Sequence, residues 1–424
     1  MVFAMKKHSV ILGAGPCGLG ALWQVRKDGY TDICLYEQSD HAGGLSSSCV
    51  DAKGFIWDMG GHVMGTKNKA FIDEMRSLYT DPLDRHTRSA WVRVGSTMIP
   101  YPIQYHSDTL PHGGGKTGLG TTSYSRDASF HQWILRSFGK ELANTFFLPF
   151  NRKLWKYPLN KMSTVWIQEK IPQYTKTHNR SRWGANASFY YPRRGGIGSV
   201  WNRIAGGLKP YISYNKRVVA IDANTHTVTF SDHTQVTYDE LVSTIPLPTL
   251  ASLVHGIVLH QASQLPYVGV AIVGVGMRGT PPDALGKCHW IYIPDATIPY
   301  FRVSVYSNYG SGNAPKGTWS LLFETSVDPK TTVDKKNIIE TTITHAKSQG
   351  LIPTGSEVIS TFFHYEPFGY PIPTINRDSV ISKVNTQLEQ HGIYSLGRFG
   401  SWRYEEGNMD DAWTQGITWA RKCV

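Results

Sequence analysis

The sequence predicts an α/β fold with more than one domain, and three patterns along the chain predict it. Near the N-terminus, an apolar run, a glycine-rich turn, a helical stretch and a second apolar run follow one another within about thirty residues. From 130 to 170, apolar side chains recur three and four positions apart, which is typical of helices. From 267 to 326, short alternating runs favour an antiparallel sheet. A length of 424 residues fits two or three domains.

The first pattern contains a nucleotide-binding motif. Residues 9–12 form an apolar run that ends in Gly13, Gly15 and Gly18, and a second run at 32–37 ends in Glu37. This is the dinucleotide fingerprint, in which the first glycine makes a tight turn, the second admits a pyrophosphate and the third lets the helix pack on the strand. The acidic residue accepts hydrogen bonds from the ribose. The motif predicts a Rossmann-type domain.

Two further glycine pairs favour FAD over NAD as the dinucleotide. Gly43 and Gly44 follow Glu37 closely and can continue along the pyrophosphate, whereas Gly60 and Gly61 can lie against a flat flavin ring. Each pair alone is weak, but together they predict an FAD-binding domain.

The remaining segments complete the expected architecture. Residues 112–125, rich in Gly, Ser and Thr, predict a loop, and residues 210–246 predict strands separated by turns. Helices are expected at 332–349 and 411–422. We expect an FAD-binding domain built from 1–87, 186–250 and 383–424, a helical substrate-binding domain at 103–185, and an antiparallel sheet domain at 88–102 and 251–382.

Charge and composition limit the partners. The chain has 43 Lys and Arg against 32 Asp and Glu, a net charge of +11. The basic residues occur at most in pairs, such as Arg193-Arg194, so we expect no nucleic-acid partner. The longest apolar run, 267–277, contains three glycines and is too short to span a bilayer, so we expect no membrane partner.

The cysteines indicate a compartment. None of the five has the paired spacing of a zinc or redox motif, so we expect no metal site. Free thiols are typical of reducing conditions, and the N-terminus lacks the apolar core of a signal peptide. We therefore expect a cytoplasmic protein whose natural start is Met1 or Met5.

Five motifs in chain order resemble one family. They are FIWDMGGHV at 55–63, YPIQ at 101–104, PFNRKLW at 149–155, SNY at 307–309 and GRFGSWRYEEGN at 397–408. Together they resemble the eukaryotic-type UDP-galactopyranose mutases, and the matches extend from about residue 8 to about residue 415, with the last motif the most specific.

The resemblance implies a flavoenzyme that interconverts the pyranose and furanose forms of a nucleotide-sugar, UDP-galactopyranose and UDP-galactofuranose, without net redox change. FAD would be active when reduced, with NADPH or NADH as the reductant. Its N5 would attack the anomeric carbon, expel the diphosphate and form a flavin–iminium intermediate. This chemistry explains why no Ser-His-Asp or paired-carboxylate site is needed.

The resemblance also implies residues for the reaction and the cofactor. Arg302 and Arg398 would grip the leaving diphosphate, and His62 would lie near flavin N5 and direct its hydrogen bonding through a backbone carbonyl. These three are the expected catalytic residues. The expected cofactor ligands are Gly13, Gly15, Gly18, Glu37, Gly43, Gly44, Leu45, Gly60, Gly61, His62, Val219, Gly397, Asn408 and Met409.

The substrate set follows from the same resemblance. The base would be bound by Tyr101, Gln104, Asn151 and Trp155. Trp290 would line the sugar, and Asn186, which follows Trp183 and Gly184, would belong to a flap that closes over the substrate. The expected substrate ligands are Tyr101, Gln104, Asn151, Trp155, Lys170, Asn186, Trp290, Tyr292, Arg302, Tyr309, Tyr370, Arg398 and Tyr404.

Three positions depart from the family pattern. Lys170 stands where an arginine is expected and lacks its planar fork. Ile103 stands where an aromatic residue would stack on the base, and Gly65 stands in place of a bulky phenylalanine near the sugar. Residues 113–125 replace a longer helical segment that supports oligomers, so a monomer or homodimer is expected rather than a tetramer.

These departures leave alternatives open. One is a mutase for a different nucleotide-sugar. Another is a flavin amine oxidase or desaturase, which shares the FAD domain but surrounds the flavin with an apolar or aromatic cage. Arg302 and Arg398, with several tyrosines, favour an anionic substrate instead. A non-enzymatic FAD-binding scaffold is the third alternative.

Overall fold

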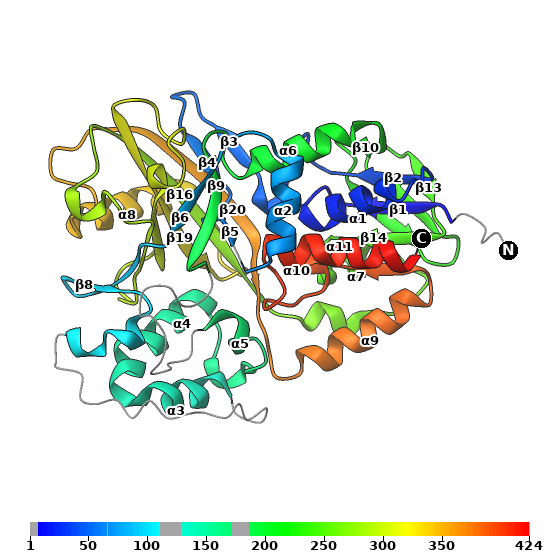
Figure 1. Ribbon diagram of the computed structural model, residues 1–424. Coiled ribbons are helices and arrows are strands. Elements are labelled where there is room, and N and C mark those ends of the chain that lie inside the picture. Colours follow the sequence, from blue (N-terminus) through cyan, green and yellow to red (C-terminus); the bar gives the residue numbers. More distant parts are fainter. Residues whose placement is uncertain (1–6, 66, 111–128, 172–185, 424) are drawn as a thin grey trace.

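A computed structural model describes residues 7–65, 67–110, 129–171 and 186–423 (Figure 1). The loop expected at 112–125 lies outside these ranges, and so do Trp183 and Gly184, which precede the expected flap residue Asn186. Among the described residues, no helix is long and apolar enough to cross a membrane.

Five parallel strands form the first sheet, in the order β10-β2-β1-β14-β21. β1 and β14 are buried along their whole length, as expected of parallel strands covered on both faces. Strands from both ends and the middle of the chain meet here, so this part of the fold is discontinuous in sequence. The bounds are β1 Ser9–Leu12, β2 Ile33–Tyr36, β10 Ile212–Ser213, β14 Glu240–Ser243 and β21 Ile393–Ser395.

Two helices from opposite ends of the chain, α1 (Pro16–Lys27) and α11 (Met409–Cys423), lie side by side next to this sheet (Figure 1). Each helix carries a glycine at the contact. A Cβ atom at Gly20 would lie 2.6 Å from the backbone oxygen of Trp413, and one at Gly416 would lie 2.1 Å from that of Cys17. The close approach therefore requires glycine. The helix expected at 411–422 begins two residues earlier, at Met409.

A second sheet has seven strands in the order β20-β16-β19-β18-β17-β7-β8. Its neighbours are antiparallel except β17 and β7, which are parallel. The expected antiparallel sheet is thus mixed at one pair, because β7 joins the edge from a distant segment and no hairpin turn sets its direction. The bounds are β7 Ala90–Val94, β8 Thr97–Pro100, β16 Tyr267–Arg278, β17 Trp290–Tyr292, β18 Arg302–Val305, β19 Thr318–Val327 and β20 Val358–Pro371.

Glycines in β16 admit aromatic rings from β4 (Ile56–Asp58) and the residue before it. A Cβ atom at Gly274 would lie 2.5 Å from the Trp57 ring, and one at Gly276 would lie 2.6 Å from the Phe55 ring. The two rings stack with centroids 5.7 Å apart. This packing fixes β4 on the second sheet, and β4 leads directly into the glycine pair before His62.

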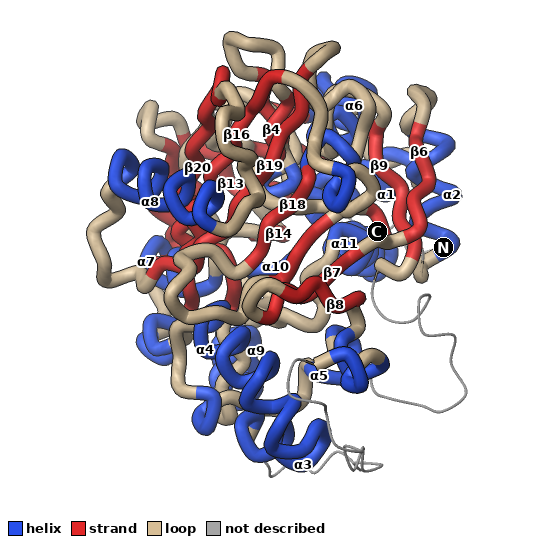
Figure 2. Tube along the Cα trace, turned by 90° about the vertical axis from the view of Figure 1, so that its left-hand side faces the viewer, coloured by secondary structure: helices blue, strands red, loops and turns tan. Residues whose placement is uncertain are grey.

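The helical segment has α3 (Phe130–Leu142), a π-helical turn, α4 (Leu148–Trp155) and the short α5 (Ile167–Lys170). Ser129 and Gln132 form a capping box at the start of α3, and Gly139 interrupts the helix with a φ of +70°. Figure 2 shows these helices gathered at one end of the molecule, below the strands.

The other elements connect these layers. Asp334 caps α8 by accepting from the backbone N–H of Asn337, so that helix begins at Lys335 rather than at 332. The domain boundaries given above remain a prediction. The remaining bounds are β3 Ser48–Val50, β5 Met64–Gly65, α2 Lys69–Leu78, β6 Leu83–Thr87, β9 Ser188–Pro192, α6 Gly198–Gly207, β11 Val218–Asp222, β12 Thr227–Phe230, β13 Gln235–Thr237, α7 Leu247–Leu253, β15 Val254–His255, α8 Lys335–Ser348, α9 Arg377–Glu389 and α10 Gly397–Gly400.

Candidate active site

The glycine turn after β1 has the geometry that the fingerprint demands. Gly13 has a φ of +105°, and a Cβ atom at Gly18 would lie 2.0 Å from the Gly13 oxygen. A side chain at Gly18 would therefore push α1 off the strand. At Gly15, in contrast, the nearest atom to an added Cβ is 4.0 Å away, in Gly43. Gly15 thus leaves one side of the backbone open at the N-terminus of α1, where helix dipole and free N–H groups favour a phosphate.

The second glycine turn lies against the first. The N–H of Gly43 donates to the oxygen of Ala14 at 2.9 Å, and a Cβ at Gly44 would lie 3.4 Å from Gly15. Glu37 is buried, and its carboxylate accepts from the N–H groups of Ala14 at 2.7 Å and Ser39 at 2.8 Å. The acid is thereby fixed beside the first turn.

Four other expected cofactor ligands lie in separate elements. Gly397 is the first residue of α10 and has a φ of +79°. A Cβ atom at Gly397 would lie 3.1 Å from the side chain of Cys17 in α1. Leu45 is half-buried in the turn after Gly44. Val219 sits at a bulge in β11 and is 44% exposed. Asn408 directly precedes Met409, the first residue of α11.

His62 lies close enough to the two expected catalytic arginines for both of their charges to act on it. Gly60 has a φ of +136°, and its oxygen accepts from the His62 N–H at 2.9 Å. Burial, with smaller effects of the charges of Arg398 and Arg302, lowers the pKa of His62 to about 3. The imidazole is therefore neutral, and its Nδ1 is buried without a hydrogen-bond partner among the described residues.

Arg302 is held by a residue that sequence analysis did not identify. Glu324, opposite it in the β18–β19 ladder, accepts from both Nε and Nη2, the latter at 2.7 Å. Burial opposes the charged form, but Glu324 outweighs it, so the pKa of Arg302 lies well above its usual value. The guanidinium also lies against Gly61, where a Cβ would be 3.0 Å from Nη2. Glu324 is the charged residue in the otherwise apolar run of β19, and this was the feature of the sequence that could have identified it.

Arg398, in α10, is oriented by the loop that follows this helix. Its Nη1 donates to the oxygen of Gly407 at 2.8 Å. Its guanidinium carbon lies 5.3 Å from the ring centroid of Tyr370 and 5.4 Å from that of Tyr404. The two tyrosines thus bracket the second arginine.

Four of the expected substrate tyrosines form two ring pairs. The Tyr404 ring lies 5.8 Å from Tyr370, and the Tyr101 ring lies 4.9 Å from Tyr292. Burial raises the pKa of Tyr101, Tyr370 and Tyr404, so their hydroxyls stay neutral donors at physiological pH. Tyr309 donates instead to Ser304 Oγ at 3.1 Å.

Lys170 joins this group from the helical segment. Its Nζ donates to Asn408 Oδ1 at 2.9 Å and lies 5.6 Å from the Tyr404 ring. The structure thus brings a third cation to the Tyr404 side of the two arginines.

Three of the four expected base ligands are buried, and two of them, Asn151 and Trp155, form hydrogen bonds inside the protein. Asn151 donates to the oxygen of Phe147 at 2.8 Å and accepts from Trp155 Nε1 at 3.1 Å. Trp155 is fully buried, with its ring 5.0 Å from Tyr404, and Gln104 is 1% exposed. Ile103 is fully buried as well. In this conformation its side chain belongs to the core.

Gly65, which stands in place of a phenylalanine of the family pattern, does not leave an open space beside it. A Cβ at Gly65 would lie 2.6 Å from Asn186 Oδ1, so the Asn186 carboxamide occupies that place. Gly65 pairs with Phe189, whose ring lies 6.0 Å from that of Trp290. Trp290 is buried, and its Nε1 has no partner among the described residues.

The arrangement fits FAD. The open backbone at Gly15 and the facing turn at Gly43 and Gly44 leave room for a pyrophosphate at a helix N-terminus. The buried Nδ1 of His62 has no partner among the residues described, and Gly61 beside it packs against Arg302, so this segment can accept a flat ring. In the described part of the chain, no three His, Cys, Asp or Glu side chains gather to hold a metal ion.

Comparisons with known proteins agree with this geometry. The family model described as flavin containing amine oxidoreductase matches residues 18–424. A crystal structure of reduced UDP-galactopyranose mutase superposes with a TM-score of 0.92 at 34% identity, covering 97% of this chain and 94% of that chain.

More distant structures share the fold alone. Putrescine oxidase bound to putrescine has a TM-score of 0.71 at 16% identity, with 98% of each chain covered. A fatty acid isomerase from P. acnes that produces CLA has a TM-score of 0.70 at 13% identity, with 99% of each covered. The expected fold class is confirmed, whereas the eukaryotic type remains a prediction. The chain belongs to the flavin-containing amine oxidoreductase family and, within it, to the UDP-galactopyranose mutases.

Proposed function

We propose that this protein is an FAD-dependent isomerase that interconverts UDP-galactopyranose and UDP-galactofuranose. The observation that carries the proposal is that two arginines act on one neutral histidine, His62, and that neutral tyrosines lie against Arg398. Such a site suits a dianionic diphosphate. When bound, reduced FAD supplies the nucleophile for the anomeric carbon.

The side chains would act on the leaving diphosphate. Arg302 and Arg398 offset the negative charge that develops as the bond to the sugar breaks, which lowers the barrier because they are already oriented. Tyr370 and Tyr404 add neutral donors that do not compete for the proton. His62, being neutral, adds no charge of its own, and its position is fixed through Gly60.

The amine-oxidase alternative suits this site poorly. A protonated amine would meet the positive charges of Arg398 and Lys170 near Tyr404. Repulsion between like charges in a buried site raises the cost of binding such a substrate.

The oxidation state of the flavin provides the test. The dithionite-reduced protein should convert UDP-galactofuranose to UDP-galactopyranose, and the oxidised protein should not, as measured by chromatography of the two sugars. Comparable turnover by the oxidised protein, or hydrogen peroxide release with an amine, would contradict the proposal.

A mutase for another nucleotide-sugar is the second candidate, and the buried Ile103 and the lysine at 170 favour keeping it. A panel of nucleotide-sugars binding to the reduced enzyme, followed by fluorescence, separates the two. Tightest binding of a sugar other than UDP-galactose would select the second candidate.

Arg302 can be tested separately. Arg302→Lys keeps the charge but loses the fork that Glu324 holds. Mutase activity should fall about a hundredfold while the visible flavin spectrum stays intact. The matched control is Arg278→Lys, an exposed arginine that also pairs with a glutamate, Glu357. Wild-type activity in Arg302→Lys would show that the diphosphate role is wrong.

Three finer expectations belong to the same proposal. NADPH or NADH would reduce the flavin, which anaerobic stopped-flow absorbance can follow. The protein would be a cytoplasmic monomer or homodimer, and light scattering after gel filtration measures its mass. A tetramer would contradict that expectation.

A further inference from the structure

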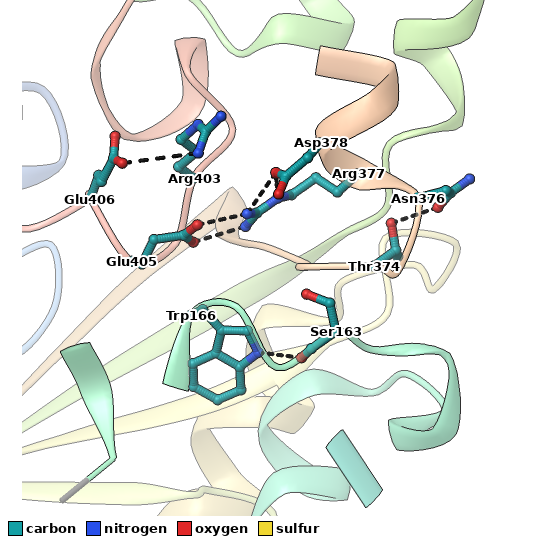
Figure 3. A network of polar contacts seen from close by, with 9 residues as sticks. All are labelled: Ser163, Trp166, Thr374, Asn376, Arg377, Asp378, Arg403, Glu405 and Glu406. Atoms are coloured by element: carbon teal, nitrogen blue, oxygen red, sulfur yellow. Dashed lines mark hydrogen bonds and ion pairs between the residues drawn. The ribbon is translucent and has the colours of Figure 1, made fainter. Parts of the chain in front are cut away.

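A buried ion pair holds the loop that carries Tyr404. Arg377, the first residue of α9, donates from Nη1 to Glu405 Oε2 at 2.8 Å and from Nη2 to Glu405 Oε1 at 2.6 Å (Figure 3). The Arg377 side chain is 1% exposed and that of Glu405 is 11% exposed. Burial opposes the charge on Arg377, but Glu405 and Asp378 raise its pKa above the usual value, so the pair is ionic.

The pair joins two parts of the molecule that meet at the substrate side. Glu405 directly follows Tyr404, in the loop between α10 and α11. Arg377 follows a segment that pairs with the helical region: Thr374 forms a bridge with Met162, and the Ser163 N–H donates to the oxygen of Pro373 at 2.8 Å. The ion pair therefore ties the Tyr404 loop to the helical segment.

That helical segment also contacts Tyr404 directly. Trp166 donates from Nε1 to the oxygen of Ser163 at 2.9 Å (Figure 3). The Trp166 ring lies 5.4 Å from the Tyr404 ring. Arg398 donates to the oxygen of Gly407 in the same loop. A shift of the loop would thus move Tyr404 and the carbonyl that orients Arg398 together.

We infer that Arg377 and Glu405 are positioning residues that hold Tyr404 and Arg398 in place for the departing diphosphate. The inference rests on the proposed function. A bidentate pair fixes both distance and plane, whereas an exposed single contact fixes neither. Asp378 accepts from Arg377 at 2.9 Å and is half exposed, so it keeps the arginine paired when Glu405 is changed.

Glu405→Gln in the FAD-loaded, reduced enzyme is the test. The amide keeps the size of the side chain but loses the charge and one acceptor. We expect kcat to fall about tenfold to a hundredfold, because small misplacements cost that much. The KM for UDP-galactofuranose should change less than about threefold, since the developing charge is felt most in the transition state. The dissociation constant of UDP, which resembles the leaving group, should rise about tenfold.

Two further variants separate positioning from stability. Arg377→Lys keeps the charge without the fork and should give an intermediate kcat. The double variant Arg377→Lys/Glu405→Gln should be no worse than Glu405→Gln, because the pair acts as a unit. The control is Glu357→Gln, which breaks an exposed arginine pair in the second sheet and should keep wild-type kcat and UDP affinity.

The outcomes are distinguishable. A lower melting temperature in Glu405→Gln with unchanged kcat and UDP affinity overturns the inference and leaves the mutase proposal intact. If the reduced wild-type enzyme has no mutase activity, the proposed function is wrong, and the inference that rests on it falls with it. Loss of kcat and of UDP affinity with unchanged flavin content supports the inference.

Discussion

Gly65 shows how one residue can redirect the chemistry of its neighbours. In the sequence, Gly65 is a small residue at a position where the family pattern has a phenylalanine. In the structure it is the reason that the Asn186 carboxamide lies where a side chain at 65 would be. Asn186 has a φ of +56°, a conformation that asparagine adopts more readily than most residues.

Gly65→Ala should therefore displace Asn186. The methyl would lie 2.6 Å from Oδ1, which must rotate away, and the KM for UDP-galactopyranose should rise about threefold to tenfold if that amide binds substrate. Steady-state kinetics of the reduced enzyme measures it.

Asn186→Ala is the matched comparison for this prediction. It should raise KM by a similar factor, and the double variant should add nothing further. A raised KM in Asn186→Ala with an unchanged KM in Gly65→Ala would contradict the link between the two residues.

Arg302 and Glu324 mark the limit of prediction at this scale. The arginine belongs to a recognisable strand, and the family resemblance implies its role, but its partner is 22 positions away in sequence and opposite it only because β18 and β19 pair in one register. A shift of that register by one residue would put the two side chains on different faces.

At the scale of elements, the contact between β1 and α1 depends on glycine. The first glycine turn is readable from sequence because the residues that make it lie within six positions. The turn also affects packing beyond its own residues, because the helix that it starts, α1, lies against α11 through Gly20 and Gly416.

Gly18→Ala should separate these elements. The added methyl would lie 2.0 Å from the Gly13 oxygen, a backbone atom that cannot move alone. We expect a loss of about 3 kcal/mol in the free energy of unfolding and purified protein with little flavin absorbance. Urea unfolding and the visible spectrum measure the two effects.

Gly206→Ala is the control for this change. Gly206 lies in α6, and a Cβ there meets nothing within 4 Å. Alanine is the better helix former, so this variant should be slightly more stable and keep its flavin. Equal flavin content in both variants would refute the packing argument.

At the scale of the whole molecule, two buried histidines contribute to the loss of stability in acid. His289 Nδ1 accepts the N–H of Ser89 at 3.0 Å, and burial, with a smaller effect of His86, lowers the pKa of His289 to about 4. The pKa of His62 is lower still, at about 3. In the unfolded chain both would take up protons near pH 6.5. Their contribution to stability is thus fully present above pH 6.5 and is lost as the pH falls toward 4 and 3.

His289→Asn should reduce this acid sensitivity, because an amide oxygen can accept the same N–H but does not titrate. Between pH 7 and pH 5, at saturating FAD, the wild type should lose about 2 kcal/mol more of its unfolding free energy than the variant. Urea midpoints at the two pH values measure the difference.

His260→Asn, at an exposed position, is the control and should follow the wild type. If His289→Asn loses as much stability as the wild type, His289 is protonated in the folded chain and the prediction is wrong.

The amino-acid sequence by itself determined the α/β class, the glycine path beside Glu37 and the family, because these depend on residues close together in the chain or on motifs in fixed order. Only the tertiary structure decided which groups meet: Glu324 with Arg302, Asn186 with Gly65, and Glu405 with Arg377. It also decided that β7 runs parallel to β17. Those contacts join distant segments, and their geometry follows from strand register and from the packing of helices and loops, which no local pattern encodes.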